Sequence, residues 1–361
     1  MSKRKVAVLG ATGAVGQRFV QLLNNHPWFE VTVLTGSDRT VGKTYGEGCR
    51  WILPSAMPDW ARTMRVHDTQ PGIDAEIVFS ALSADLAQDL EPAFAAAGQH
   101  VFSNASAYRM APDVPLLIPE VNADHAALLT TQRRLRNWSG SIATNCNCTA
   151  TGFTVSLKPL QAAFGLRRIF AVSMQAASGA GYPGVSALDL IDNVVPYISG
   201  EEEKMERETC KMLGNLQAAQ IEPAPIQISA HTNRVPVLDG HTVCVTVEFG
   251  TAATPADIIA VLHDFKPPAI VASLPSTPSR TIEVRPEQSR PQPRLDRDAG
   301  GGMTTVVGRV RADSVLHARY VVLSHNTIKG AAGGSLQNAE LCVALSLIEP
   351  QIKYLGFRLL E

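Results

Sequence analysis

Cys148 carries the main chemical signal in this sequence. It lies in the segment TNCNCTATG, residues 144–152, and Gln175, Arg234 and His241 follow it along the chain. A thiolate forms a covalent acyl intermediate only if a base takes the thiol proton and hydrogen-bond donors stabilise the oxyanion. A cysteine, a histidine and a positioned amide are the smallest set that meets this need. The sequence therefore predicts acyl transfer through a cysteine thiol.

The neighbours of Cys148 predict how its thiol is activated. Residues 149–152 are small and suit the start of a helix. At a helix N-terminus the macrodipole lowers the pKa of a thiol, and free backbone amides point at a developing oxyanion. Cys146 and Cys148 could instead be half of a metal site, but no second closely spaced Cys/His pair completes a tetrahedral set. We therefore expect no metal.

Arg234 lies seven residues before His241, across the turn Asp239-Gly240. A hairpin at this turn would bring both side chains to one cleft. The imidazole would then serve as acid and base, and the guanidinium as a bidentate clamp for a carboxylate. The alternative for Arg234 is a surface ion pair.

A strand and a glycine turn open the chain. Residues 6–9 are apolar, and Gly10, Gly13 and Gly16 follow them at the start of an expected helix. In this arrangement backbone amides at the helix N-terminus can approach a pyrophosphate. Many glycine turns merely connect two elements, so the context of strand and helix is what favours dinucleotide binding.

The end of the second expected strand bears on the choice of dinucleotide. An NAD-specific fold usually places an acid there for the ribose hydroxyls, whereas here Ser37 and Arg39 flank Asp38. Arg39 favours a 2′-phosphate and therefore NADP. Alternatively, Arg39 is a surface residue in a turn, and Asp38 partly cancels its charge.

The elements that would position these residues alternate regularly in the first part of the chain. Strands are expected at residues 6–9, 31–35, 77–80 and 101–103, and helices at 15–23 and 84–97. This alternation predicts a parallel, doubly wound sheet of the Rossmann type.

Beyond Cys148 the segments become rich in Thr and Val, and their alternation is typical of antiparallel strands packed on one face. We expect strands at 169–175, 241–249 and 304–311, helices at 184–194 and 202–213, and a solvated or functional loop at 284–302. An apolar helix at 336–348 should return to the first domain. The predicted fold class is α/β, with a Rossmann-type domain (1–147 and 327–361) and an α+β catalytic and dimerisation domain with a mainly antiparallel sheet (148–326).

Composition excludes several classes of function. With 361 residues, 45% hydrophobic content and a net charge of −1, the chain can bury two cores. Lys/Arg runs are absent, which removes the electrostatic case for nucleic acid or an anionic membrane, and no apolar segment reaches the roughly 18 residues of a membrane span. The first strand leaves no room for a signal peptide, so we expect a cytoplasmic protein whose six cysteines remain thiols.

Eight segments together resemble aspartate-semialdehyde dehydrogenases, most closely the archaeal and fungal type. They follow the order of the family over nearly the whole chain: residues 10–16, 103–110, 119–122, 144–152, 175–181, 201–204, 234–241 and 326–333. The resemblance implies reductive dephosphorylation of L-4-aspartyl phosphate by NADPH to L-aspartate 4-semialdehyde and phosphate, a step shared by lysine, methionine and threonine biosynthesis. It also implies a homodimer or homotetramer.

The resemblance also implies a role for each site residue. Cys148 would be the nucleophile, His241 the general acid/base, and Gln175 the group that orients the acyl chain. The substrate would be held at its carboxylate by Arg234, at its ammonium by Glu201, and at its phosphate by Arg109, Asn104 and Lys204. The cofactor would contact Gly10, Thr12, Gly13, Ala14, Val15, Gly16, Ser37, Arg39, Ser80, Ser178, Gly179, Asn326 and Gly333.

At two places the sequence departs from the family pattern or does not decide which residue fills a role. Position 146 is more often Pro or another non-thiol residue in the family, so Cys146 raises the possibility of oxidative pairing with Cys148. Three consecutive acids precede Lys204, and we choose Glu201 for the ammonium because it lies one helical turn before the lysine on the same face.

Two alternative functions are weighed against this interpretation. N-acetyl-glutamyl-phosphate reductase resembles the family in chemistry but handles an acylated amine, so it would have no use for Glu201. A non-catalytic NADP-binding redox module would instead use Cys146 and Cys148 as its sensor.

Overall fold

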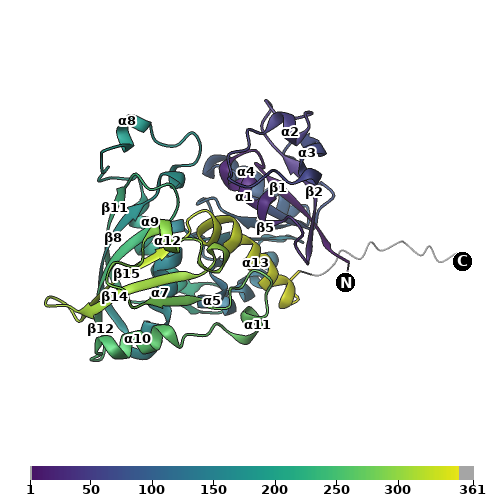
Figure 1. Ribbon diagram of the computed structural model, residues 1–361. Coiled ribbons are helices and arrows are strands. Elements are labelled where there is room, and N and C mark those ends of the chain that lie inside the picture. The colour runs from purple at the N-terminus through teal and green to yellow at the C-terminus, as the bar shows by residue number, and fades with distance from the viewer. Residues whose placement is uncertain (1, 349–361) are drawn as a thin grey trace, which may run out of the picture.

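Two large β-sheets, with helices between and around them, dominate the structure (Figure 1), and β9 and β10 form a small third sheet. The computed structural model describes residues 2–348. Within these residues no helix is long and apolar enough to cross a membrane.

The first sheet has seven strands in the order β3-β2-β1-β4-β5-β7-β6, and all neighbouring strands run parallel. The strands are β1 Arg4–Leu9, β2 Phe29–Thr35, β3 Val66–His67, β4 Ile77–Ser80, β5 His100–Ser103, β6 Leu116–Leu117 and β7 Ser141–Asn145. The central strands β4, β5 and β7 are buried at every residue, because helices cover both faces of a parallel sheet.

The helices of this part connect successive strands. They are α1 Ala14–Leu22, α2 Tyr45–Gly48, α3 Asp59–Thr63, α4 Ala84–Ala96, α5 Pro119–Asn122, the 3₁₀ helix η1 Ala123–Ala127 and α6 Leu128–Arg136. The strands and helices predicted for residues 6–103 are confirmed, with their ends displaced by at most two residues. The Rossmann-type prediction for this part is therefore correct.

The second sheet has six strands in the order β11-β8-β12-β15-β14-β13. They are β8 Leu166–Gln175, β11 Gln227–Arg234, β12 His241–Phe249, β13 Ile282–Arg285, β14 Thr305–Ala312 and β15 Ala318–Ser324. The three central pairs are antiparallel and the two edge pairs are parallel. The prediction of a mainly antiparallel sheet is confirmed.

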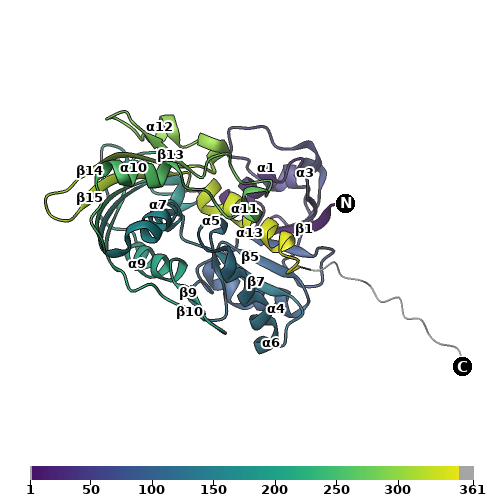
Figure 2. The ribbon, with the colours of Figure 1, turned by 90° about the horizontal axis from the view of Figure 1, so that it is seen from below.

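One face of the second sheet packs on α7 Cys148–Phe164, and α9 Glu201–Met212 packs on β11. Figure 2 shows both helices on the side of this sheet that faces the first sheet. On the opposite face the side chains of Phe170 and Val172 are 50% and 41% exposed. This sheet therefore buries one side and leaves an apolar surface on the other.

The helix predicted at 184–194 is wrong. The only helix there is the single turn α8 Ala187–Leu190, and this segment stands away from the body of the molecule (Figure 1). Asp192 interrupts it with a φ of 58°, and Leu188 is 90% exposed. Because Leu188, Ile191 and Val194 are all exposed, burial contributes little to a longer helix here.

The end of the described chain returns to the first sheet as predicted. A π-helical turn, η4 Ile328–Ala332, leads into α13 Gly333–Ala344, which contacts β4, β5 and β7. The helix ends four residues before the predicted Ile348. The remaining elements are η2 Ala177–Ala180, β9 Asn215–Leu216, β10 Ile221–Glu222, α10 Pro255–His263, α11 Ala269–Ala272, α12 Pro293–Asp296 and η3 Ala299–Gly302, the last two within the expected loop at 284–302.

Candidate active site

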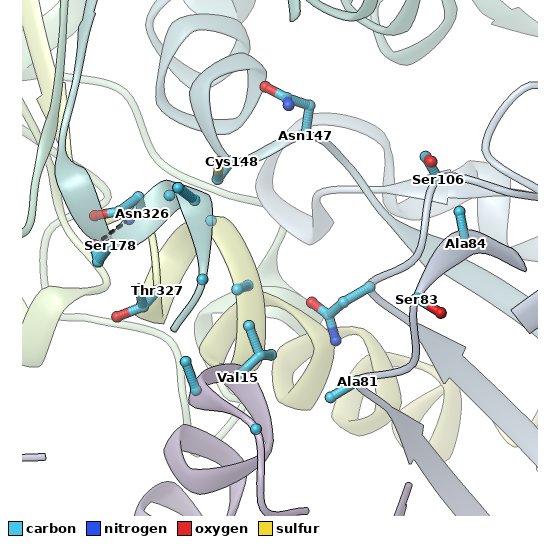
Figure 3. A pocket seen from close by; sticks show the side chains of 18 of the residues that line it. Val15, Ala81, Ser83, Ala84, Ser106, Asn147, Cys148, Ser178, Asn326 and Thr327 are labelled. Atoms are coloured by element: carbon cyan, nitrogen blue, oxygen red, sulfur yellow. Dashed lines mark hydrogen bonds between the residues drawn. The ribbon is translucent and has the colours of Figure 1, made fainter. Parts of the chain in front are cut away.

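A cavity of about 650 Å³ lies between the ends of the first-sheet strands and the start of α7. Figure 3 shows Ser178, Asn326 and Thr327 on one side of it and Ala81, Ser83 and Ser106 on the other, with Cys148 between the two groups. Of the residues predicted from the sequence, those that line it are Gly13, Ala14, Val15, Asn104, Arg109, Cys148, Ser178, Gly179, Glu201, Lys204 and Asn326.

Cys148 is the first residue of α7, as the small residues after it predicted. Asn147 is the N-cap, and its side-chain oxygen accepts hydrogen bonds from the amides of Thr149 and Ala150 at 2.9 and 3.1 Å. The expectation that these amides are free for an oxyanion is therefore wrong for two of them, because Asn147 already satisfies them.

The thiol of Cys148 is paired with His241. The distance from Cys148 Sγ to His241 Nε2 is 3.2 Å, and His241 Nδ1 accepts a hydrogen bond from the backbone amide of Ala176 at 3.0 Å. A nitrogen that accepts an N–H carries no proton of its own, so the proton of the neutral ring is on Nε2 and faces the sulfur. The ring is thus set to donate a proton toward Cys148.

Burial keeps His241 uncharged. Together with the charges of Arg234 and His325, burial lowers the pKa of His241 to about 3. Protonation of Nδ1 would also place the added proton against the N–H of Ala176. His241 therefore stays neutral over the physiological pH range.

The expected lowering of the Cys148 pKa is contradicted. Burial raises the pKa of this thiol to about 12, and the nearby carboxylate of Glu201 adds to the increase. The positive charges of Arg109 and Arg234 act in the opposite direction. Loss of hydration thus outweighs the favourable charges in the absence of a ligand.

Three strands bring His241, Gln175 and Arg234 together. β8 lies between β11 and β12, and Arg234 is directly opposite Gln175 in the parallel β11–β8 pair. Thr242, next to His241, pairs with Met174 on the other side of β8. The predicted hairpin between Arg234 and His241 is therefore wrong, although both side chains reach the same place, where a Cβ on Gly179 would lie 2.7 and 3.0 Å from them.

Arg234 and Gln175 are both buried and hydrogen-bonded to neighbouring groups. Nη1 of Arg234 donates to the carbonyl of Ala176 at 2.7 Å, which joins Arg234 to the residue that fixes His241. The amide nitrogen of Gln175 lies 3.3 Å from Oε2 of Glu201. Neither side chain lines the cavity surface, and both lie behind it.

Glu201 is the one of the three consecutive acids that lines the cavity. Its carboxylate accepts hydrogen bonds from Lys204 Nζ at 2.8 Å and from Asn147 Nδ2 at 2.7 Å. Burial alone would raise its pKa, but the bond and charge of Lys204 hold the pKa below its ordinary value. Glu202 instead binds the backbone amide of Thr232, and Glu203 is exposed.

Arg109 and Asn104 lie together on the side of the first sheet. Nη2 of Arg109 donates to the carbonyl of Asn104 at 2.8 Å, and Nη1 donates to Glu208 at 3.1 Å. The amide of Asn104 binds the carbonyl of Ser80, which is itself buried at the end of β4. Ser80 thus lies behind the cavity wall.

Steric constraints explain two of the glycines in the turn after β1. Gly10 has a φ of 66°, and a Cβ on Gly16 would lie 2.2 Å from the carbonyl oxygen of Gly10. These two glycines and Thr12 shape the turn without lining the cavity, whereas Gly13, Ala14 and Val15 line it at the start of α1. Since α1 has no side-chain cap, its first amides can receive an anion.

Three other predicted cofactor residues lie outside the cavity lining. Ser37 and Arg39 are exposed after β2, and within the part of the chain that the structure describes the guanidinium of Arg39 has no hydrogen-bond partner. Gly333 lies beside Met303 and Ile328 at the start of α13. Ser178 and Asn326, in contrast, are joined by a 2.8 Å hydrogen bond at the cavity wall (Figure 3).

Sequence reasoning missed several residues of the site. Asn147 caps α7 and binds Glu201, and its position just before a run of small residues was an available N-cap signal. A Cβ on Gly330 would lie 2.8 Å from Cβ of Cys148, a close approach that only the folded structure reveals. Cys146, in contrast, was named from the sequence as a possible oxidation partner of Cys148, and it is a free, buried cysteine whose sulfur lies 3.0 Å from Oγ1 of Thr151.

Known proteins share both parts of this architecture. Residues 5–129 match the NAD-binding domain of semialdehyde dehydrogenases, and residues 157–329 match their dimerisation domain. The class defined by the fold and the site is therefore that of two-domain semialdehyde dehydrogenases.

Relatives narrow this class further. The aspartate-semialdehyde dehydrogenase of Archaeoglobus fulgidus is 52% identical over 344 residues, 95% of this chain and 99% of that protein. The one of Schizosaccharomyces pombe is 44% identical over 96% of this chain and all of its own. The crystal structure of the Candida albicans enzyme with NADP superposes with a TM-score of 0.89 at 41% identity, over 96% of this chain and 100% of that one. The chain belongs to the aspartate-semialdehyde dehydrogenase family, which confirms the resemblance seen in its motifs.

Proposed function

We propose that the protein converts L-4-aspartyl phosphate and NADPH to L-aspartate 4-semialdehyde, phosphate and NADP through a thioester on Cys148. The observation that carries the proposal is the pair formed by Cys148 Sγ and His241 Nε2, 3.2 Å apart, beside a cavity that the glycine turn also lines. The relatives are aspartate-semialdehyde dehydrogenases, and the Candida albicans structure contains NADP, which supports the same substrate and cofactor here.

The first half of the reaction belongs to Cys148. The thiol proton passes to the leaving phosphate while the sulfur attacks the acyl carbon and the bond from that carbon to the phosphate oxygen breaks, and Arg109, Asn104 and Lys204 receive the phosphate. Because the pKa of this half-buried thiol is raised, a substrate that brings the cations closer to the sulfur favours the thiolate.

NADPH, when bound, supplies the hydride that reduces the thioester carbon. His241 holds its proton at Nε2, 3.2 Å from the sulfur. As the carbon–sulfur bond breaks and the aldehyde is released, the Nε2–H group donates a hydrogen bond to the thiolate left on Cys148, which then takes up a proton from solvent. Gln175 keeps the acyl chain in place, Arg234 holds the α-carboxylate, and Glu201 holds the ammonium.

The cofactor side is proposed from the turn. Gly13, Ala14 and Val15 would receive the pyrophosphate at the uncapped start of α1, and Arg39 with Ser37 would bind the 2′-phosphate. The nicotinamide would lie beside Ser178, Gly179 and Asn326. Gly10, Thr12, Gly16, Ser80 and Gly333 would support these contacts from behind.

We also propose a cytoplasmic homodimer or homotetramer whose domains divide at 1–147 with 327–361 and at 148–326, residues 349–361 lying outside the described chain. The match to a dimerisation domain and the half-exposed Phe170 and Val172 support the assembly. The return of α13 to the first sheet supports the division. In the cell, the step would serve lysine, methionine and threonine biosynthesis.

The test is the reverse reaction, followed as NADPH formation from L-aspartate semialdehyde, phosphate and NADP. We expect turnover that requires phosphate. N-acetyl-glutamate semialdehyde is the matched control, since its acetamide offers no ammonium of the substrate to the buried Glu201 carboxylate. Preference for the acetylated substrate would contradict the proposal, and binding of NADP without turnover of either aldehyde would favour a non-catalytic redox module.

A further inference from the structure

One face of α9 carries four charged residues with the spacing of successive helical turns: Glu201, Lys204, Glu208 and Lys211. The first two line the cavity. The other two lie deeper, between α9 and the segment that follows β5, and no step of the reaction proposed above uses them. Both are nearly inaccessible, at 2% and 4% exposure.

Glu208 connects Arg109 to the residue before the nucleophile. Its Oε1 accepts a hydrogen bond from Arg109 Nη1 at 3.1 Å, and its Oε2 accepts one from the backbone amide of Asn147 at 2.6 Å. Both carboxylate oxygens are thus occupied by groups of the site. A buried carboxylate with these partners fixes the guanidinium relative to Cys148, because charge-assisted hydrogen bonds are short and directional.

Lys211 holds the backbone that carries Arg109. Its ammonium donates to the carbonyls of Arg109, Ala111 and Val114 at 2.7, 2.8 and 2.9 Å. All three N–H groups of the lysine are used, and each of these three carbonyls gains a donor. Burial lowers the pKa of Lys211 to about 8, because the ammonium loses its hydration.

The guanidinium of Arg109 is only partly satisfied by these contacts. Nη1 binds Glu208 and Nη2 binds the carbonyl of Asn104. Nε is buried and, within residues 2–348, has no hydrogen-bond partner. Arg109 also lines the cavity, so its guanidinium can face an anionic ligand there.

We propose that Glu208 and Lys211 are positioning residues that aim Arg109 at the phosphate group of the substrate. Glu208 orients the guanidinium, and Lys211 fixes the main chain of Arg109. The helix α9 therefore supplies groups that face the substrate and also groups that position Arg109 in the cavity wall. The proposal rests on the proposed function, in which Arg109 receives the phosphate.

A double-mutant cycle tests this role. Glu208→Gln keeps an oxygen for the Asn147 amide but loses the charge that orients Arg109. We expect the KM for phosphate in the reverse reaction to rise about ten- to a hundredfold, with the KM for the semialdehyde changed less than about threefold. In the Arg109→Lys background the same substitution should add little, because Glu208 acts through Arg109.

Two further variants make the test specific. Glu206→Gln, on the same helix, removes a carboxylate that binds the Ala230 amide and should leave both KM values unchanged. Lys211→Met leaves Glu208 in place and should raise the KM for phosphate as well. If Glu208→Gln fails to fold, Lys211→Met still decides the question.

Binding of inorganic phosphate to the NADP-loaded enzyme, measured by calorimetry, separates this proposal from the proposed function. Weaker phosphate binding in Glu208→Gln and Lys211→Met would support the positioning role even if the enzyme did not turn over. Equal phosphate affinity in all variants, a parallel rise in both KM values, or independent effects of Arg109→Lys and Glu208→Gln would overturn it.

Discussion

The catalytic half of the cavity and the dinucleotide-binding turn hold their groups in opposite ways. Around Cys148 the side chains are bound to one another, as His241 is to the sulfur and Glu201 to Lys204. At the turn, α1 begins without a side-chain cap, and Arg39 is exposed. The catalytic half is therefore organised before a ligand arrives, whereas the turn depends on the ligand for its partners.

The largest expected effect breaks the catalytic half. Cys148→Ser should fold but lose essentially all turnover, because a serine hydroxyl is not ionised at this site near neutral pH. Cys146→Ser is the matched control and should stay active, since a hydroxyl can replace the thiol beside Thr151. Steady-state rates of the two variants decide the assignment, and an inactive Cys146→Ser with an active Cys148→Ser would reverse it.

Two arginine substitutions should divide the substrate side. Arg234→Lys keeps the charge but cannot bind a carboxylate with two parallel hydrogen bonds. We therefore expect a raised KM for the semialdehyde and a loss of about ten- to a hundredfold in kcat/KM. Arg109→Lys should instead raise the KM for phosphate. Both KM values are measured in both variants, and a phosphate-selective defect in Arg234→Lys would contradict the proposed carboxylate clamp.

The pH dependence of alkylation sharpens the electrostatic contrast. Because burial raises the pKa of Cys148 to about 12, its thiolate fraction should increase about tenfold per pH unit between pH 6 and pH 9. Iodoacetamide labelling of the free enzyme, quantified on the peptide that contains Cys148, should follow that slope. His241 should add no inflection there, since its pKa is about 3. A plateau below pH 8 would mean that the thiolate exists without substrate.

The smallest expected effect concerns the turn. The enzyme should prefer NADPH to NADH by at least about tenfold in kcat/KM, because a charge-assisted contact to the 2′-phosphate contributes roughly 1.5 to 3 kcal/mol. Arg39→Ala should reduce that ratio without affecting Cys148. Equal use of both cofactors by the unchanged enzyme would refute the role given to Arg39 and Ser37.

The same contrast explains what the sequence could predict. The strand, the turn and α1 are adjacent in the chain, and Gly10 and Gly16 are required by sterics within that one segment, so the motif predicted its own structure. The start of α7 at Cys148 was likewise predictable from local residues. Apolar runs and side-chain alternation predicted seven of the fifteen strands in residues 2–348, and they missed long strands such as β7, β11 and β15.

Relations between distant segments were less accessible. Arg234 and His241 meet across β8 rather than in a hairpin, and this strand order is not encoded in their spacing. The direction of the Cys148 pKa shift depends on burial and on Glu201, which only the fold brings close. From the sequence alone, Glu208 would be expected on the solvent-exposed face of a helix. Its role depends on its contact with Arg109, which only the fold brings close.

A single-turnover experiment without phosphate tests the central claim most directly. Mixed with L-aspartate semialdehyde and NADP, the enzyme should form about one NADPH per active site and then stop, because the thioester has no phosphate to receive the acyl group. Mass spectrometry of the acid-quenched protein should find one aspartyl group, located on Cys148. Absence of the burst, or an acyl group on Cys146, would contradict the account.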